Sequence, residues 1–222
     1  IAVTRVAPVS LTSVTPDTVS NQGSVQLTVL GAGFVRGSVP KVALTSASED
    51  IGFDAMYVKS SQSFDRIDAA TLLLDDPSRG VGDETRTTHT WINLSNQGAQ
   101  GVFTAGEQTF ARPFNTDGSN YAIRFTGYVY VASPGKRYFG VNSDDGFSLH
   151  INGQLVGEYA NARGPATTDV TGNSTDGTMT YNFPAAGPYY LVLDFYENGG
   201  GEEIEFFQTN ATGGDRRLIN AD

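Results

Sequence analysis

The sequence predicts an all-β fold. Apolar and polar residues alternate in short runs, for example at Phe147, Leu149 and Ile151, as expected for half-buried strands. Two turn signals, Pro134-Gly135 and Asn152-Gly153, follow such runs. Helical spacing is confined to residues 64–74. Hydrophobic residues make up 39% of the 222 residues, which is enough to form a sizeable core.

The N-terminal segment differs in character from the rest of the chain. Residues 14–16 read V-x-P, and residues 23–34 read G-x-x-x-L-T-V-x-G-x-G-F. This segment resembles the opening of an IPT/TIG immunoglobulin-like domain, so we assign residues 1–46 to Ig-like strands or to an N-terminal extension. A complete domain of that family needs about 80–90 residues. The segment is therefore a truncated unit, a unit whose later strands continue into residues 40–75, a set of extra strands on the next domain, or a strand donor to a neighbouring subunit.

Residues 64–74 follow the spacing of a helix only in part, with apolar side chains at Phe64, Ile67, Ala70 and Leu74. A proline at position 77 disfavours helical backbone at the residue before it. We expect a strand or a short turn here.

The stretch that follows residue 125 predicts a strand, a Pro-Gly turn and a second strand that leads into Ser143-Asp144-Asp145-Gly146. Two adjacent aspartates repel each other, and if their side chains converge they need a proton or a shared counter-ion. Side chains of neighbouring strand residues point to opposite faces, so convergence requires unusual backbone such as a cis peptide. Oxygen ligands of this kind suit Ca²⁺. The alternative is a solvated turn, because Asn, Ser, Asp and Gly are common turn residues.

The order of these elements resembles the PA14 domain family. The chain shows F-x-G, a strand, P-G-x-x-Y-F, a strand, S-D-D-G, a strand and I-N-G, and later the segment 183–198 and a closing strand at 204–207. We assign residues 47–222 to this domain, with the strongest resemblance over about 120–207. The resemblance implies a β-sandwich or barrel to which the N-terminal Ig-like strands are added.

The resemblance also implies a site. In lectin-type PA14 domains a cis-linked acidic pair holds Ca²⁺, whose open coordination positions accept sugar hydroxyls. Asp144 and Asp145 match that pair, and Asn198 lies in the stretch that supplies a further oxygen ligand. Gly200, in the triple-glycine loop, would let backbone carbonyls approach the ion, and Glu202 would add negative charge and contact the ligand. The loop could equally be a plain hairpin connection. We expect Trp91, the single tryptophan, to be buried; exposure beside Asp144 would make it a platform for a sugar ring.

Composition excludes some classes of partner. A formal net charge of −10 argues against nucleic-acid binding, and the lack of a long apolar run argues against membrane insertion. The chain has no cysteine, which favours a prokaryotic secreted or cell-surface protein over a disulfide-bonded eukaryotic one. We recognise no nucleophile elbow, phosphate-binding loop or His-x-x-x-His pair, so we expect no enzyme activity.

Two functions remain. The first is a Ca²⁺-dependent carbohydrate-binding module of an adhesin-type protein, with a glycan or polysaccharide as partner. The second is a structural unit of an extracellular layer or filament that self-associates through its N-terminal strands.

Overall fold

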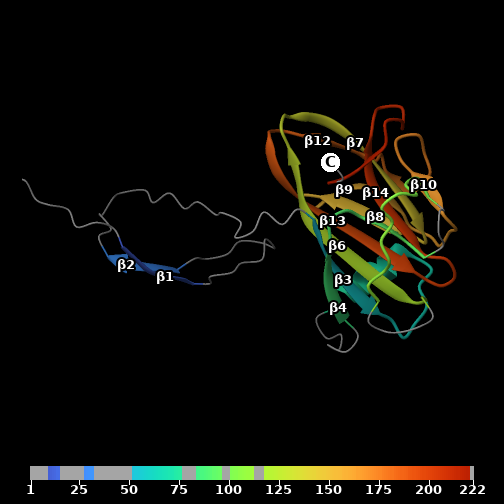
Figure 1. Ribbon diagram of the computed structural model, residues 1–222, viewed down its shortest axis with the longest axis horizontal. Coiled ribbons are helices and arrows are strands. Elements are labelled where there is room, and N and C mark those ends of the chain that lie inside the picture. Colours follow the sequence, from blue (N-terminus) through green and yellow to red (C-terminus); the bar gives the residue numbers. More distant parts are fainter. Residues whose placement is uncertain are drawn as a thin grey trace, which may run out of the picture. The chain divides into compact units, whose positions relative to one another are not determined.

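The computed structural model describes residues 10–15, 28–32, 52–76, 84–96, 101–112 and 118–220. The chain divides into two compact units, Ile1–Glu49 and Asp50–Asp222. Figure 1 shows both units, and each is considered by itself below.

The second unit is an all-β domain in which all the pairs of neighbouring named strands are antiparallel. Its elements are β3 (Phe53–Lys59), α1 (Ile67–Asp75), β4 (Glu84–His89), β5 (Asn93–Ser95), β6 (Tyr121–Val131), β7 (Gly135–Asp144), β8 (Phe147–Ile151), β9 (Gln154–Tyr159), β10 (Ala166–Thr168), β11 (Asp176–Gly177), β12 (Thr180–Phe183), β13 (Gly187–Glu197), β14 (Glu203–Thr209) and β15 (Arg217–Leu218).

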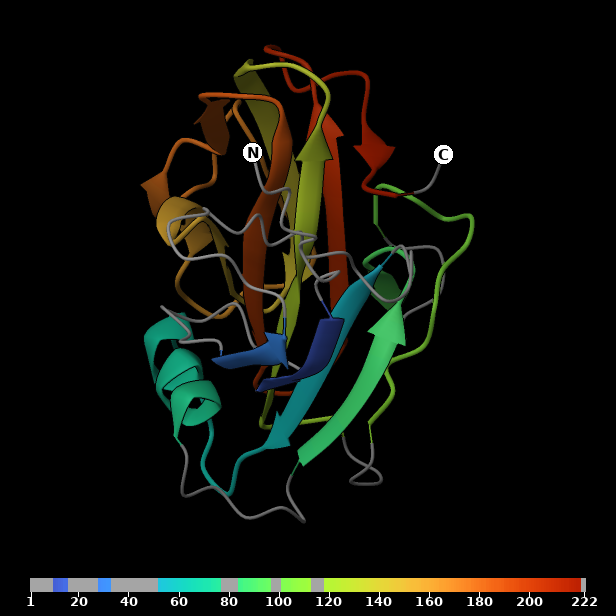
Figure 2. The same cartoon turned by 90° about the vertical axis from the view of Figure 1, so that its left-hand side faces the viewer.

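These strands form two sheets. One has seven strands in the order β11-β9-β8-β13-β6-β3-β4, and the other has six strands built around β10-β7-β14-β15, with β12 on β7 and β5 on β14. Figure 2 shows the long strands of the domain running in layers. The all-β prediction is therefore confirmed.

The core lies between the two sheets. Phe53 from β3 and Phe206 from β14 meet with ring centroids 6.2 Å apart, and Phe206 also stacks on Phe139 of β7. Fully buried apolar residues from both sheets belong to this one cluster, as a β-sandwich requires. Successive side chains of a strand point to opposite faces of the sheet. In β14, Ile204 and Phe206 enter the core, so Glu203 and Glu205 point to the other face.

The strands predicted on either side of both turns are present. Only β8 and β9 form a hairpin, because β6 and β7 belong to different sheets and do not pair with each other. The strands β6 and β7 lie on either side of residues 132–134, and β8 and β9 are joined by Asn152 and Gly153, whose φ angles are +48° and +75°. Both positive values are those that a tight two-residue hairpin turn needs. The closing strand predicted at 204–207 lies within β14.

The prediction for residues 64–74 was wrong, because residues 67–75 form helix α1. The helix covers one end of the outer face of the seven-stranded sheet, where Ile67, Ala70 and Leu74 pack on side chains such as Tyr196 (Figure 2). An ion-pair network also links the helix to the sheet. Arg124 of β6 donates two hydrogen bonds of 2.7 Å to Asp194 and reaches Asp75 at the end of the helix.

The N-terminal unit contains an antiparallel pair of strands, β1 (Ser10–Thr15) and β2 (Thr28–Ala32). Val29 of the predicted alternating strand lies in β2, whereas Val25 and Leu27 lie outside the described residues. The assignment of residues 1–46 to Ig-like strands or to an N-terminal extension stays a prediction.

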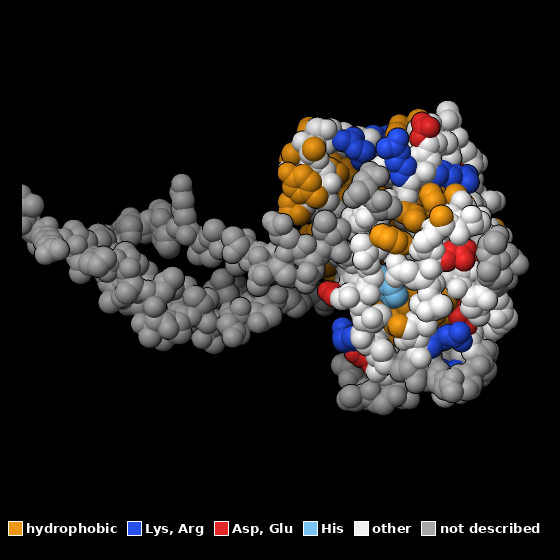
Figure 3. Space-filling model, viewed as in Figure 1, with side chains coloured by type: hydrophobic (Ala, Val, Ile, Leu, Met, Phe, Trp, Pro, Cys, Tyr) orange, Lys and Arg blue, Asp and Glu red, His pale blue; other side chains and the backbone are white. Residues whose placement is uncertain are grey.

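The described surface has one notable apolar feature. In Figure 3 hydrophobic side chains gather over the ends of β6 and β13, and the exposed large aromatic residues of β6 are Tyr128 and Tyr130. Among the described residues, no helix has both the length and the apolar character needed to cross a bilayer.

Candidate metal centre

Three buried carboxylates converge at one end of the sandwich. Asp144, Asp145 and Glu197 each offer an oxygen, and these oxygens lie within 4.8 Å of one another. Their side chains are 7%, 5% and 0% exposed. Asp144 ends β7 in one sheet, whereas Glu197 ends β13 in the other.

Backbone pairing brings these residues to the same place. Glu197 is the last residue of β13 and lies opposite Tyr121, the first residue of β6. The amide of Tyr196 donates to the carbonyl of Gly146, which ties β13 to the segment that follows the acidic pair. The Asp144-Asp145 peptide bond is cis. A cis peptide is one of the unusual geometries that the adjacent aspartates led us to expect.

Asp145 is held by backbone donors. Its Oδ1 accepts from the amide of Arg163 and its Oδ2 accepts from the amide of Asn198, each at 2.8 Å. Burial raises the pKa of Asp145, while the two amide hydrogen bonds act in the opposite direction. The carboxylate is therefore fixed in orientation in spite of its burial.

Glu197 is the least satisfied member of the group. Its Oε1 accepts from the amide of Gly199 at 2.6 Å, but its Oε2 is buried and has no hydrogen-bond partner. Burial, and then the charges of Asp145 and Asp144, raise the pKa of Glu197 to about 10. A buried acceptor without a donor is destabilising by roughly 1–3 kcal/mol. Glu197 therefore needs a proton or a cation at the point where the three carboxyl groups meet.

Arg163 donates hydrogen bonds to Ser143, the residue that precedes the acidic pair. Its Nε donates to the carbonyl of Ser143, its Nη2 donates to the Ser143 hydroxyl and its Nη1 donates to the Thr168 hydroxyl. Its guanidinium also lies 4.1 Å from the ring centroid of Tyr159. The Ser143 hydroxyl in turn donates to the carbonyl of Asp145 at 2.6 Å. Arg163 therefore fixes the backbone on both sides of the Asp144 side chain.

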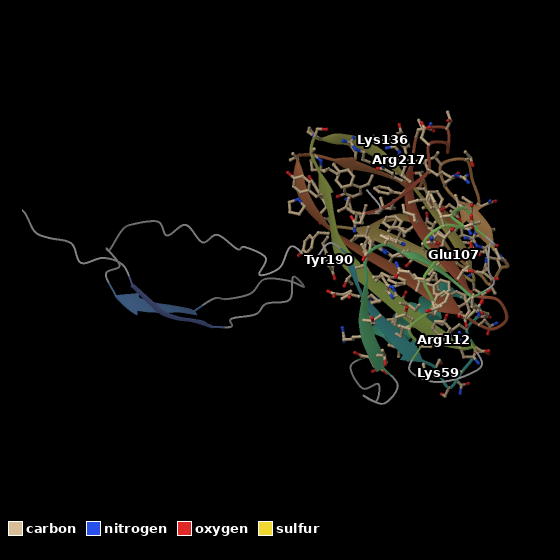
Figure 4. The ribbon with its side chains drawn as sticks, in the orientation of Figure 1. Lys59, Glu107, Arg112, Lys136, Tyr190 and Arg217 are labelled. Carbon is tan, nitrogen blue, oxygen red and sulfur yellow. The ribbon has the colours of Figure 1, made fainter. Side chains whose placement is uncertain are left out.

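Glu202 and Glu203 form a second acidic layer beside the group. Glu202 is fully buried and forms an ion pair with Arg112 at 2.8 Å, and Glu203 lies opposite Asp144 across β7 and β14. Burial is the largest cause that raises the pKa of Glu202 to about 7 and that of Glu203 to about 8. Figure 4 places Arg112 toward the lower end of the domain, near Lys59.

The structure can now be compared with the predicted site residues. It brings Asp144 and Asp145 together and places the backbone of Asn198 in contact with Asp145. Gly200 is exposed with φ +109° and has open space around it, and Glu202 is buried with Arg112. The roles of Asn198, Gly200 and Glu202 toward a ligand stay predictions.

Two expectations about other side chains need revision. The predicted ligand set omits Glu197, although Glu197 completes the carboxylate group. No local sequence signal identifies it, because its place beside the acidic pair depends on how β13 pairs with other strands. Trp91 is half-buried instead of buried, and its indole donates to the carbonyl of Gly106 at 3.1 Å.

The fold and the carboxylate group define an all-β sandwich domain with a candidate cation site at one end. The family model described as "PA14 domain" matches residues 92–215, so the chain belongs to the PA14 domain family. The model begins beyond the N-terminal unit, and the IPT/TIG resemblance therefore stays a prediction.

Two solved structures illustrate the likeness in fold. The PA14 domain of the MpAFP antifreeze protein is 18% identical with a TM-score of 0.55, and the alignment covers 81% of this chain and 93% of that one. A structure described as the PA14 sugar-binding domain from an RTX adhesin is 17% identical with a TM-score of 0.53, and the alignment covers 76% of this chain and 94% of that one. No curated protein sequence matches the chain significantly.

Proposed function

We propose that this protein is a Ca²⁺-dependent carbohydrate-binding module of a secreted or cell-surface adhesin-type protein. The observation that carries the proposal is the unpartnered, buried Oε2 of Glu197 beside the carboxylates of Asp144 and Asp145. Three carboxyl groups in such proximity, with a buried oxygen that no donor reaches, fit the coordination chemistry of a divalent cation, and a bound cation would keep all three ionised.

The donor set fits a hard cation. All three side chains are carboxylates. The sequence has no cysteine, so no thiolate can serve as a ligand. Ca²⁺ takes six to eight oxygen ligands at about 2.3–2.6 Å. Asp144, Asp145 and Glu197 would hold the ion, and Asn198 and the loop carbonyls near Gly200 are the proposed additional donors.

The loop that follows Glu197 is suited to ligand access. Gly199 and Gly200 are exposed, and a side chain at Gly200 would meet no atom within 4 Å. A bound Ca²⁺ with open coordination positions would accept vicinal sugar hydroxyls there. Glu202, close behind the loop, would add negative charge, which favours neutral sugars over acidic ones. The solved relative from an RTX adhesin is described as sugar-binding, which supports this choice of ligand class.

Glycan binding measured with and without Ca²⁺ tests the proposal. The full chain is applied to the same panel of neutral and acidic glycans twice, once in CaCl₂ and once in EGTA. The ionic strength is kept roughly equal, so that salt screens charge interactions to the same extent in both measurements. Binding to neutral glycans is expected only in Ca²⁺ and is expected to be lost in Asp145→Asn. The matched control is Asp54→Asn, an exposed aspartate at the far end of β3. Glycan binding that is equal in EGTA, or that survives Asp145→Asn, contradicts the proposal.

The second function, a structural unit that assembles through the N-terminal strands, stays a prediction. Removal of residues 1–20 distinguishes the two. Sugar binding should persist in the shortened chain, whereas assembly of the kind predicted for the N-terminal strands should be lost.

A further inference from the structure

The outer face of the six-stranded sheet carries a second group of oxygen-bearing side chains. Asn93 of β5 and Asn142 of β7 lie in register on either side of Glu205 of β14. Glu203 lies two residues from Glu205 on the same face of β14. These four residues therefore form a compact polar patch across three neighbouring strands.

A loop covers this patch and is tied to it. The amides of Val102 and Phe103 donate to the two carboxylate oxygens of Glu205, at 2.8 and 2.7 Å. The amide nitrogen of Asn93 donates to the carbonyls of Phe103 and Ala105, each at 3.2 Å. Because both donor hydrogens of that nitrogen are used, the orientation of the Asn93 amide is fixed. Its oxygen must then point away from the loop carbonyls.

Gly101 brings the loop backbone against the carboxylates. Its φ is +129°, and a Cβ atom at this position would collide with a carboxylate oxygen of Glu203 and lie 2.7 Å from one of Glu205. A residue with a side chain does not fit such a position without displacement. The loop is thus built to approach these two glutamates closely.

Two buried oxygens in the patch have no hydrogen-bond partner, Oε2 of Glu203 and Oδ1 of Asn93. The two side chains are 0% and 1% exposed, so bulk water does not satisfy them. Asn142 donates to the other oxygen of Glu203. Buried acceptors that lack a donor are uncommon in folded proteins, and each calls for an explanation such as a bound ion.

The charge around the patch is negative. Burial is the main factor that disfavours ionisation of Glu203, followed by the charges of Glu205, Glu107 and Asp144. The hydrogen bond from the side-chain amide of Asn142 favours ionisation. Residues 97–107 contain no lysine or arginine. Figure 4 shows Glu107 on the side of the domain opposite to Tyr190 in that view. Either a proton on Glu203 or a bound cation would relieve this negative charge.

We propose that Glu203 and Asn93 hold a second hard divalent cation beneath the loop of residues 101–106, with Glu205 and Glu107 providing further negative charge. The site lies beside the group of Asp144, Asp145 and Glu197, since Asp144 is directly opposite Glu203, but it uses different ligands and binds no sugar. Its role is to fasten the loop to the sheet. Trp91 reports on that loop, since its indole donates to the carbonyl of Gly106 and it is the only tryptophan in the chain.

The test counts Ca²⁺ bound to the full chain by equilibrium dialysis and follows Trp91 fluorescence during Ca²⁺ titration. We expect two ions bound per wild-type chain, and one fewer in Glu203→Gln and in Asp145→Asn. The Trp91 response should persist in Asp145→Asn and disappear in Glu203→Gln. Asp54→Asn is the matched control and should behave as the wild type. If Glu203→Gln does not fold, Glu107→Gln should weaken the fluorescence-linked affinity at least twofold.

Unchanged stoichiometry and an unchanged Trp91 response in folded Glu203→Gln would overturn the inference, since a proton on Glu203 would then satisfy the patch. Unchanged affinity in Glu107→Gln would count against it equally. The two sites can fail separately. One ion that depends on Asp145 alone refutes this inference and leaves the proposed function standing, whereas one ion that depends on Glu203 alone does the reverse.

Discussion

Asp144 lies directly opposite Glu203 across the ladder that joins β7 to β14. Like charges at directly opposed positions destabilise a sheet. Burial of both side chains makes that repulsion stronger, because water screens it less. The negative charge at this end of the domain is therefore an intrinsic source of instability, and its relief by protons or cations should be measurable.

Calcium should stabilise the wild-type chain through the carboxylate group. At a free concentration one hundred times Kd, binding to the native state contributes about 2.7 kcal/mol, which corresponds to a rise in Tm of about 5–10 °C for a domain of this size. Glu197→Gln should remove most of the shift, because it removes one of the three charges that meet there. Differential scanning calorimetry with CaCl₂ and with EGTA measures both values. A full shift in the variant would show that the cation binds elsewhere.

Without divalent cations, stability should fall as pH rises from about 5 to 9. The folded-state pKa values of Glu202 and Glu203 are about 7 and 8, above the ordinary value of 4.5. The native state therefore binds more protons than the unfolded state, and the stability from these groups is full below pH 4.5 and is lost as pH rises through 7 and 8. Thermal unfolding in EGTA at several pH values measures the trend. A Tm that rises over this interval would contradict the prediction, and the double variant Glu202→Gln, Glu203→Gln should show a flatter profile.

Arg163→Met should destabilise the domain by about 2–4 kcal/mol, with or without Ca²⁺. The change removes three side-chain hydrogen bonds and the contact with the Tyr159 ring. Arg163→Lys retains a charge but not the planar fork, so it should recover less than half of the loss. Urea denaturation measures both variants. Complete recovery by lysine would show that charge alone matters at this position.

Gly146→Ala should lower stability by about 1–3 kcal/mol and weaken Ca²⁺ binding. A Cβ atom there would lie 2.6 Å from the ring of Tyr196 and 2.7 Å from the carbonyl of Tyr159, so the segment that carries Asp145 would have to shift. The matched control is Gly164→Ala, which would meet no atom within 4 Å. Chemical denaturation and calorimetric Ca²⁺ titration of both variants give the comparison, and equal behaviour of the two would refute the steric argument.

Local signals in the sequence predicted much of the strand arrangement. Asn152-Gly153 indicates a tight turn by residue type, and the alternation around it indicates two half-buried strands, both of which the structure contains. Helix α1 could not be predicted in this way. It packs on the sheet and is linked to it by Arg124, Asp194 and Asp75, which lie far apart in the sequence and meet only in the folded domain.

The candidate site shows the same division. Asp144 and Asp145 were conspicuous because they are adjacent, and adjacency is visible in a sequence. Glu197 lies on a different sheet, and the pairing of β13 with β6 and β8 carries it to the acidic pair. Long-range register of this kind has no local signature, so a single sequence reveals the pair more readily than the group.

The carboxylate group bridges the two layers of the sandwich, since Asp144 ends β7 in one sheet, Asp145 follows it, and Glu197 ends β13 in the other sheet. An ion bound by all three carboxylates would link the two sheets at this end of the domain. A tensile force that separates the layers would then have to rupture metal–oxygen bonds in addition to the aromatic packing between them. The domain would bear the greatest load in calcium-rich surroundings and yield at a lower force where calcium is scarce.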